Sequence, residues 1–227
     1  MRGEAFVGER RERARLAPWA SACGLARRIA SARVEPRPSR AESIAASLRG
    51  VRVALCEPSW SDEEEFVALR LASREFLAPW EATLEGLDPF GPERFRRFMA
   101  RGPTRRRFLI RSRDGGELVG ALSFSEVDRA RRTATVGYWI GAEHARQGLM
   151  SEALPLGLAW ACSELDLERI DAYVLPENDA SIALLVKCGF ALDAVVPRYR
   201  VVAGRMRDHE RWTLALAADA RASASPE

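Results

Sequence analysis

Residues 136–153 read VGYWIGAEHARQGLMSEA and decide how the rest of the chain is arranged. An apolar segment with two neighbouring aromatic residues leads into a turn, a loop of small residues and the first turn of an amphipathic helix. A helix N-terminus favours an anion, and a glycine in the loop lets the backbone approach a phosphate closely. The stretch therefore predicts a strand, a phosphate-binding loop and a helix, with a strand edge available to an extended ligand.

The composition is that of a globular protein with a sizeable core. Of 227 residues, 47% are hydrophobic and 30% are charged, and no run of about 18 apolar residues predicts a membrane span. The four cysteines, at positions 23, 56, 162 and 188, form no CxxC motif and no Cys/His pair at metal-ligand spacing, so no metal site is predicted. Their scatter is typical of reduced thiols, and we expect a cytoplasmic protein.

The net charge of +3 is distributed unevenly along the chain. Residues 1–50 contain eleven Arg and five Glu, whereas the remaining 177 residues contain 24 basic and 27 acidic residues. We expect residues 1–50 to be a flexible basic extension, although a start codon assigned too far upstream would explain them equally well. No aromatic residues alternate with these arginines, which argues against nucleic-acid binding. The small polar tail, 218–227, is predicted to be disordered.

The segment 51–217 alternates between strand and helix patterns and is predicted to be one mixed α/β domain. Strands are predicted at 51–55, 105–112, 117–125, 133–141, 169–175, 190–196, 198–203 and 207–216. Helices are predicted from about 61 to 78, and at 92–99, 148–164 and 179–187.

Three separated motifs in this segment carry a resemblance to a known family. They are GYWIG (137–141) with QGLMSEAL (147–154), NDAS (178–181) with KCGF (187–190), and LAPWE (77–81) with RDH (207–209). Residues 51–216 resemble the GNAT superfamily of acyl-CoA-dependent N-acetyltransferases. More narrowly, they are similar to its RimJ/RimL type, which acetylates the N-termini of ribosomal proteins.

The resemblance implies a fold and a co-substrate. The fold is a three-layer α/β structure with a splayed mixed sheet of about seven strands and helices on both faces. Acetyl-CoA would lie in the splay between the 133–141 and 169–175 strands. The residues that would bind it, by position in the family motifs, are Trp139, Ile140, Arg146, Gln147, Gly148, Leu149, Met150, Ser151, Asn178 and Ser181. The loop amides would hold the pyrophosphate, while Trp139, Ile140 and Asn178 would contact the pantetheine arm.

The chain departs from the family pattern at three places. Arg146 stands where the loop has its first glycine, and its side chain would either add a cation to the phosphate site or remain solvated. The strand stretch 133–136 has no glutamate, which serves elsewhere in the superfamily as general base. Leu185 occupies the position of a tyrosine that often protonates the leaving thiolate. Neither of the usual proton carriers is therefore present at its usual position.

Other residues are candidates for these proton transfers. Glu126 ends the strand next to 133–141 and is the candidate general base, the alternative being a solvated turn carboxylate. Ser181 is the candidate proton donor to the thiolate, the alternative being a partner in helix capping. His209 is interpreted as structural, because it would tie the last strand to its neighbour.

The acceptor end of the site is expected around Trp80, Glu81 and Tyr138, where Glu81 would attract a cationic N-terminus. The preferred acceptor is a protein N-terminal α-amine, attacking the thioester directly because no cysteine stands where a covalent intermediate would form. A small amine, such as an amino acid, an antibiotic or a polyamine, is an alternative acceptor. A non-catalytic acetyl-CoA sensor is an alternative of another class, and a homodimer is left open as the assembly.

Overall fold

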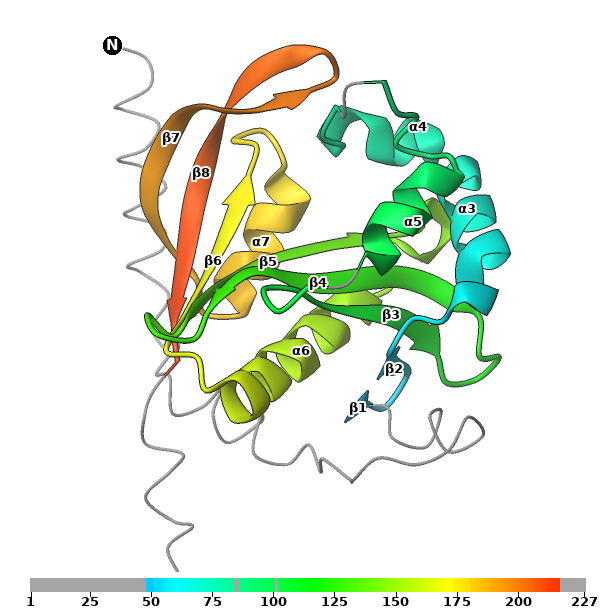
Figure 1. Ribbon diagram of the computed structural model, residues 1–227, viewed down its shortest axis with the longest axis horizontal. Helices are drawn as coiled ribbons and strands as arrows, with labels where there is room; N and C mark the ends of the chain where they lie inside the picture. Colours follow the sequence, from blue (N-terminus) through cyan, green and yellow to red (C-terminus); the bar gives the residue numbers. More distant parts are fainter. Residues whose placement is uncertain (1–47, 84–85, 101, 217–227) are drawn as a thin grey trace, which may run out of the picture.

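The computed structural model describes residues 48–83, 86–100 and 102–216. Its strands form a single eight-stranded sheet in the order β1-β2-β3-β4-β5-β6-β8-β7 (Figure 1). The strands are β1 (Leu48–Arg49), β2 (Val53–Cys56), β3 (Arg106–Ser112), β4 (Leu118–Asp128), β5 (Thr133–Ile140), β6 (Arg169–Val174), β7 (Ala191–Val202) and β8 (Arg205–Ala215). The helices are η1 (Trp60–Asp62), α3 (Glu63–Ala72), α4 (Arg74–Leu77), η2 (Ala78–Trp80), α5 (Pro92–Met99), η3 (Ala142–His144), α6 (Leu149–Leu165) and α7 (Asp179–Lys187). Neighbouring strands are antiparallel except β5 and β6, which run parallel.

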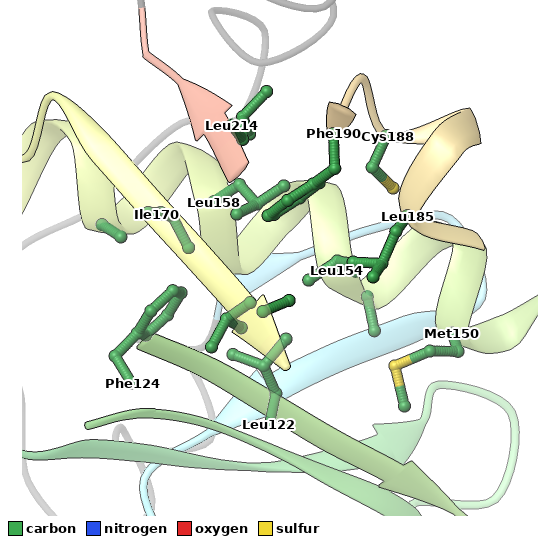
Figure 2. Packing of buried hydrophobic residues seen from close by; sticks show 14 of the residues in the cluster. Leu122, Phe124, Met150, Leu154, Leu158, Ile170, Leu185, Cys188, Phe190 and Leu214 are labelled. Atoms are coloured by element: carbon green, nitrogen blue, oxygen red, sulfur yellow. The ribbon is translucent and has the colours of Figure 1, made fainter. Parts of the chain in front are cut away.

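Helices cover both faces of the sheet, as the sequence predicted. On one face, Leu154 and Leu158 of α6 share a core with Ile170 of β6 and Leu185 of α7 (Figure 2). On the opposite face, α3 and α5 pack a smaller apolar cluster against β3 and β4. The three-layer α/β architecture with a mixed sheet is therefore confirmed.

One glycine permits the close contact between α6 and the sheet. A Cβ atom on Gly157 would lie 2.8 Å from a methyl carbon of Leu122 on β4, closer than two carbon atoms can approach. Interiors are close-packed, so this contact depends on the absence of a side chain at position 157.

The C-terminal part of the sheet differs from the prediction. The two short strands expected at 190–196 and 198–203 are one strand, β7, whose register against β8 shifts between Val196 and Arg200. Pro197 lacks a backbone N–H, but β7 lies at the edge of the sheet, where a missing donor is tolerated. Arg198 adopts a positive φ of 50°, and its N–H donates to Asp208 Oδ1 at 2.8 Å. The proline therefore produces a bulge instead of ending the strand.

Two other boundaries also differ from the prediction. The helix expected from about 61 to 78 is divided into four short pieces, with a break at Ser73, whose hydroxyl accepts from the N–H of Ala142 at 2.9 Å. Strand β1 pairs with β2 and extends the sheet to residues before 51. The remainder of the predicted extension, 1–50, and the predicted tail, 218–227, lie outside the described residues. Within the described ranges, no helix has the length and apolar character needed to span a membrane.

Candidate active site

Strands β5 and β6 are paired only at one end. Three consecutive pairs join them, ending at Thr135↔Asp171, whereas β5 remains paired with β4 as far as Ile140. The strands diverge beyond that point (Figure 1). Along 136–140, the edge of β5 that faces β6 therefore has no strand partner among the described residues. Its backbone groups are available to an extended ligand.

The loop between η3 and α6 has the backbone of an anion site. Arg146 and Gly148 both have positive φ, 60° and 78°, and such residues in a loop can turn successive N–H groups toward one concave surface. No described side chain caps the N-terminus of α6. The N–H groups of Arg146, Gln147 and Gly148 donate to no backbone carbonyl of the described residues. These free donors at the positive end of a helix dipole favour a phosphate.

Arg52 supports this loop from a distant part of the chain. Its guanidinium Nη1 donates to the carbonyl oxygen of Gln147 at 2.8 Å. Its own backbone N–H donates to Glu152 Oε1 at 2.8 Å, which ties the start of β2 to the first turn of α6. A Cβ on Gly148 would lie 3.2 Å from Arg52 Nη2. Sequence reasoning missed Arg52, because its partner Glu152 lies 100 residues away and no local pattern joins them.

The predicted loop residues offer mainly their backbone to the site. The side chains of Leu149 and Met150 are buried in the core against the sheet. Gln147 donates through Nε2 to the carbonyl oxygen of Glu143 at 2.7 Å, which holds the loop closed on η3. Of the other predicted loop residues, Arg146 is exposed, and Gly148 and Ser151 are half-buried.

The two aromatic residues of β5 lie on opposite faces of the sheet. Trp139 packs edge-on against Phe66 of α3 with ring centres 5.3 Å apart, and the guanidinium of Arg70 lies 4.9 Å from the Trp139 ring. Tyr138 and Ile140 pack against the core that α6 and α7 share. The alternation along β5 therefore directs Tyr138 toward α7.

Tyr138 meets Ser181 at the N-terminus of α7. The tyrosine hydroxyl and Ser181 Oγ are 2.8 Å apart, and one donates to the other. Asn178 Oδ1 accepts from the N–H of Ser181 at 3.1 Å and so caps α7. Burial raises the pKa of Tyr138, despite the opposing hydrogen bond from Ser181, so the phenol stays protonated at neutral pH. The structure thus brings Tyr138, expected at the acceptor end, to Ser181 and Asn178, which were both expected to bind acetyl-CoA.

A cavity of about 600 Å³ extends from this point toward α5 and the β7–β8 hairpin. Its lining includes Tyr138, Asn178, Ser181 and the backbone of Gly137. The segment after η2 closes it against β7: Thr83 donates from its N–H to the carbonyl oxygen of Val201 at 2.9 Å, and Ala82 forms a β-bridge with Val202. The unpaired edge of β5 therefore leads from the anion loop into a cavity that the segment 82–83 closes on the side of β7.

Trp80 and Glu81 also line the cavity, but Glu81 is already paired. One carboxylate oxygen of Glu81 lies 2.6 Å from Arg70 Nη2 and the other 3.0 Å from Arg94 Nη2. Arg70 is fully buried, so this carboxylate neutralises a cation in the core. Both carboxylate oxygens of Glu81 therefore form ion pairs within the chain, and its expected attraction for a cationic acceptor stays a prediction. Trp80 remains 38% exposed at the cavity wall.

Glu126 lies beside the cavity but outside its lining. It stands at a bulge of β4 with a positive φ of 53°, and its Oε2 accepts from Thr135 Oγ1 at 2.8 Å. The side chain is exposed. Its neighbours Ser125 and Thr135 do line the cavity, so the carboxylate is at the margin.

His209 of β8 is a cavity-lining residue to which sequence reasoning gave only a structural role. It is 5% exposed, and its ring packs edge-on against Tyr199 with centres 5.1 Å apart. Nδ1 lies 3.3 Å from the carbonyl oxygen of Arg207. Because a carbonyl only accepts, the neutral ring carries its proton on Nδ1, and Nε2 keeps a lone pair. Burial and the positive charges of Arg200 and Arg207 lower the pKa of His209, which favours this neutral form.

The comparison with protein families decides the identity of this fold. A model of the acetyltransferase (GNAT) domain matches residues 52–191, more than half of the chain. The chain belongs to the GNAT acetyltransferase family. The matched segment of the GNAT domain runs from the start of β2 to the first residue of β7, and so contains the anion loop, the diverging strands and α7.

Individual relatives are similar to parts of the GNAT domain. The uncharacterized N-acetyltransferase YoaA of Bacillus subtilis is 37% identical over 108 residues, which are 48% of this chain and 61% of that protein. The [ribosomal protein uS5]-alanine N-acetyltransferase of Escherichia coli is 34% identical over 97 residues, 42% of this chain and 50% of that protein. The chain thus spans between half and three fifths of these curated relatives.

A solved structure covers more of the fold. RimJ of Mycobacterium smegmatis, in complex with CoA-disulfide, superimposes with a TM-score of 0.66 at 30% sequence identity. The match covers 75% of this chain and 84% of that one. The resemblance drawn from the three motifs is therefore confirmed at the level of the family.

Proposed function

We propose that this GNAT domain is an acetyl-CoA-dependent N-acetyltransferase whose acceptor is a protein N-terminal α-amine. One observation carries the proposal: the unpaired edge of β5 connects an anion-binding loop to a cavity with proton-carrying side chains. A ligand with a pyrophosphate at one end and an extended amide-containing arm fits that arrangement. The RimJ relative is named as a CoA complex, which supports the same assignment.

The residues present suit acetyl-CoA. The free amides from Gln147 to Met150 would hold its pyrophosphate, and the backbone of Trp139 and Ile140 would pair with the amides of the pantetheine arm. Asn178 Oδ1 is used in capping α7, which leaves its Nδ2 group to donate toward the arm. Acetyl-CoA supplies an activated acetyl group as a thioester; all other functions come from the chain.

Tyr138 and Ser181 are suited to protonate the departing thiolate. Their hydroxyl groups are hydrogen-bonded at 2.8 Å and both line the cavity. The raised pKa of Tyr138 keeps a proton available at neutral pH. The pair replaces the usual helix tyrosine, whose position is held by the buried Leu185. We assign Ser181 as the proton donor and Tyr138 as its hydrogen-bond partner.

His209 is a better-placed general base than Glu126. Its neutral ring presents Nε2 as an acceptor from a buried position in the cavity wall, whereas Glu126 is exposed at the margin. An α-amine has a pKa of about 8, so a modest base suffices to remove its proton. We assign His209 this role and keep Glu126 as the competing candidate that the same experiment tests.

The residues that line the cavity support transfer of the acetyl group directly from acetyl-CoA to the amine, without a covalent enzyme intermediate. Among the described residues that line it, none is a cysteine. The nearby Cys188 is buried, and burial raises its pKa to about 12, so it is a poor nucleophile. The amine nitrogen would bond to the carbonyl carbon while the carbon–sulfur bond breaks. The amine would lose a proton to the base, and the thiolate would gain one from Ser181.

Turnover separates the enzyme from a non-catalytic sensor. The full chain is mixed with acetyl-CoA and a panel of free-amine peptides and small amines, and thiol release is followed with a chromogenic disulfide. We expect release with peptides, and mass spectrometry should show one added acetyl on the α-amine.

Ser181→Ala should lower kcat by roughly 10²-fold or more, whereas Ser163→Ala, on the far helix α6, should not. Acetyl-CoA binding without release on any amine would contradict the enzyme, and release with small amines alone would favour the alternative acceptor.

A further inference from the structure

The cavity beside the β5 edge has a strongly basic wall, most of it on the side of α5 and β3. Five arginines line it, contributed by α5, by the loop before β3, by β3 and by β7. They are Arg94, Arg97, Arg105, Arg107 and Arg200. Glu81 is the single acidic residue among the described residues of the lining, and it is shared with the buried Arg70. The cavity therefore carries a substantial net positive charge.

Most of this charge has no counter-ion in the described chain. Arg94 is paired with Glu81. Arg107 donates from Nη1 to the carbonyl oxygen of Ala100 at 2.6 Å, which orients its guanidinium without neutralising it. Arg97 and Arg105 are exposed at the wall and form no ion pair with a described residue.

The arginines that line one cavity lower one another's pKa. Burial lowers the pKa of Arg94, the charge of Glu81 opposes this, and the charges of Arg70, Arg200 and Arg97 lower it further. The pKa of Arg107 is lowered by burial and by the charges of Arg105 and Arg94. Like charges held in one cavity are unfavourable unless an anion binds among them.

The basic wall belongs to the same cavity as the proposed reacting groups. Tyr138, Ser181 and His209 line that cavity together with the arginines. An acceptor peptide whose α-amine lies at this end must continue along the cavity, at about 3.3 Å per residue if extended. Its first few side chains after the amine would then lie within reach of the guanidinium groups, which bind carboxylates with paired hydrogen bonds.

We propose that the acceptor is an acidic N-terminus, in which Asp or Glu residues closely follow the acetylated residue. The inference rests on the proposed function for the acceptor class and adds its charge. The same wall would repel polyamines and N-termini rich in Lys or Arg. Attraction of an acidic acceptor would also raise its rate of association.

Matched peptides test the proposal. Three peptides with the same first residue carry Asp, Asn or Lys at positions two to four, and kcat/KM is measured for each at saturating acetyl-CoA. We expect the Asp peptide to exceed the Asn peptide at least tenfold at low salt and the Lys peptide to be the poorest. The advantage should shrink as ionic strength rises, because salt screens the attraction.

Variants locate the effect in the basic wall. Arg97→Gln and Arg105→Gln should each reduce the advantage of the Asp peptide over the Asn peptide by roughly threefold to tenfold. The matched control is Arg96→Gln on the same helix, because Arg96 lies outside the cavity and is paired with Glu63 and Glu93. It should leave the ratio between the two peptides unchanged.

The outcomes separate this inference from the proposed function. Equal rates for Asp and Asn peptides, or a preference for Lys, would overturn the acidic acceptor while leaving the enzyme intact. If no peptide turns over, the proposed function fails, and binding of labelled Asp and Asn peptides to the CoA-loaded protein decides the inference. Tighter binding of the Asp peptide that Arg97→Gln weakens would support it, and equal binding would overturn it.

Discussion

A buried histidine and an exposed glutamate compete for one role in this site. His209 is held by a carbonyl on one ring nitrogen, and its surroundings favour the neutral ring, which leaves a lone pair for the amine proton. Glu126 bonds to Thr135 at the margin of the cavity. A base must be unprotonated and within reach of the amine, and the proposal favours His209 because its ring lines the cavity and its lowered pKa favours the neutral form.

Replacing His209 by Gln should remove the acidic limb of the pH profile. Burial and the charges of Arg200 and Arg207 lower the pKa of His209 below its ordinary value, although its hydrogen bond to the Arg207 carbonyl and the charge of Glu177 oppose them. As pH rises through that lowered pKa the ring loses its proton, so wild-type kcat should rise and level off at a lower pH than for an ordinary histidine base. His209→Gln should lower kcat by about 10²–10⁴-fold and abolish this rise. The measurement is kcat as a function of pH for the wild type, His209→Gln and Glu126→Gln. If only Glu126→Gln loses the acidic limb of the profile, Glu126 is the general base and His209 is not.

At the residue scale, the local sequence predicted the loop before α6 better than it predicted the side-chain contacts of the site. Gly148 was recognisable because a glycine before a helix start suits both a turn and an anion. The bond between Tyr138 and Ser181 joins residues 43 positions apart, and nothing in either segment predicts it. The sequence also gave no sign that Glu81 would pair with Arg70 and Arg94, because neither arginine is close to it along the chain.

At the element scale, Glu81 joins two helices that have few other polar contacts. Arg70 extends from α3 and Arg94 from α5, and both reach the same carboxylate after η2. Arg70 also donates from Nε to the carbonyl oxygen of Pro89 at 3.2 Å and lies over the ring of Phe90. Without the carboxylate, a fully buried guanidinium would lose its counter-ion.

Glu81→Gln should therefore be strongly destabilising. Removing one partner of a buried ion pair leaves an uncompensated charge and costs about 3–5 kcal/mol. Urea unfolding should show a lower midpoint with an unchanged slope. The matched control is Glu93→Gln, whose pair with Arg96 is exposed at 45% and 59% and should change the free energy of unfolding by no more than about 1 kcal/mol. Equal losses in the two variants would show that the Glu81 pair contributes no more than a surface one.

At the scale of the whole molecule, the site exists because the sheet separates between β5 and β6. One side of the gap belongs to the β1–β5 sheet with α3 and α5, and the other to β6, β8 and β7. A ligand that pairs with the β5 edge and binds the loop would contact elements from both sides. Its binding energy would therefore stabilise the whole fold.

Acetyl-CoA should raise the thermal stability of the full chain. At a concentration 100 times Kd, a ligand specific for the folded state adds about 2.7 kcal/mol, which corresponds to a Tm increase of roughly 5–10 °C for a chain of this size. Gly148→Ala should need about tenfold more ligand for the same shift, because its φ of 78° is strained for alanine and the Cβ meets Arg52. Gly116→Ala has a similar φ of 71° but open space around it. A ligand response equally weakened in both variants would contradict the loop as the phosphate site.

The sequence alone predicted most of the strands and helices, and its motifs carried the resemblance that implied the family, the three-layer architecture and a phosphate loop. Strand and helix patterns and short motifs are local properties of the chain. The tertiary structure alone decided which side chains share a cavity. It placed His209 in the cavity wall, joined Tyr138 to Ser181, and paired Glu81 with Arg70. It also gathered arginines from three elements and a loop into one wall. These relations depend on strand register and on the packing of distant segments, which a single sequence does not encode locally.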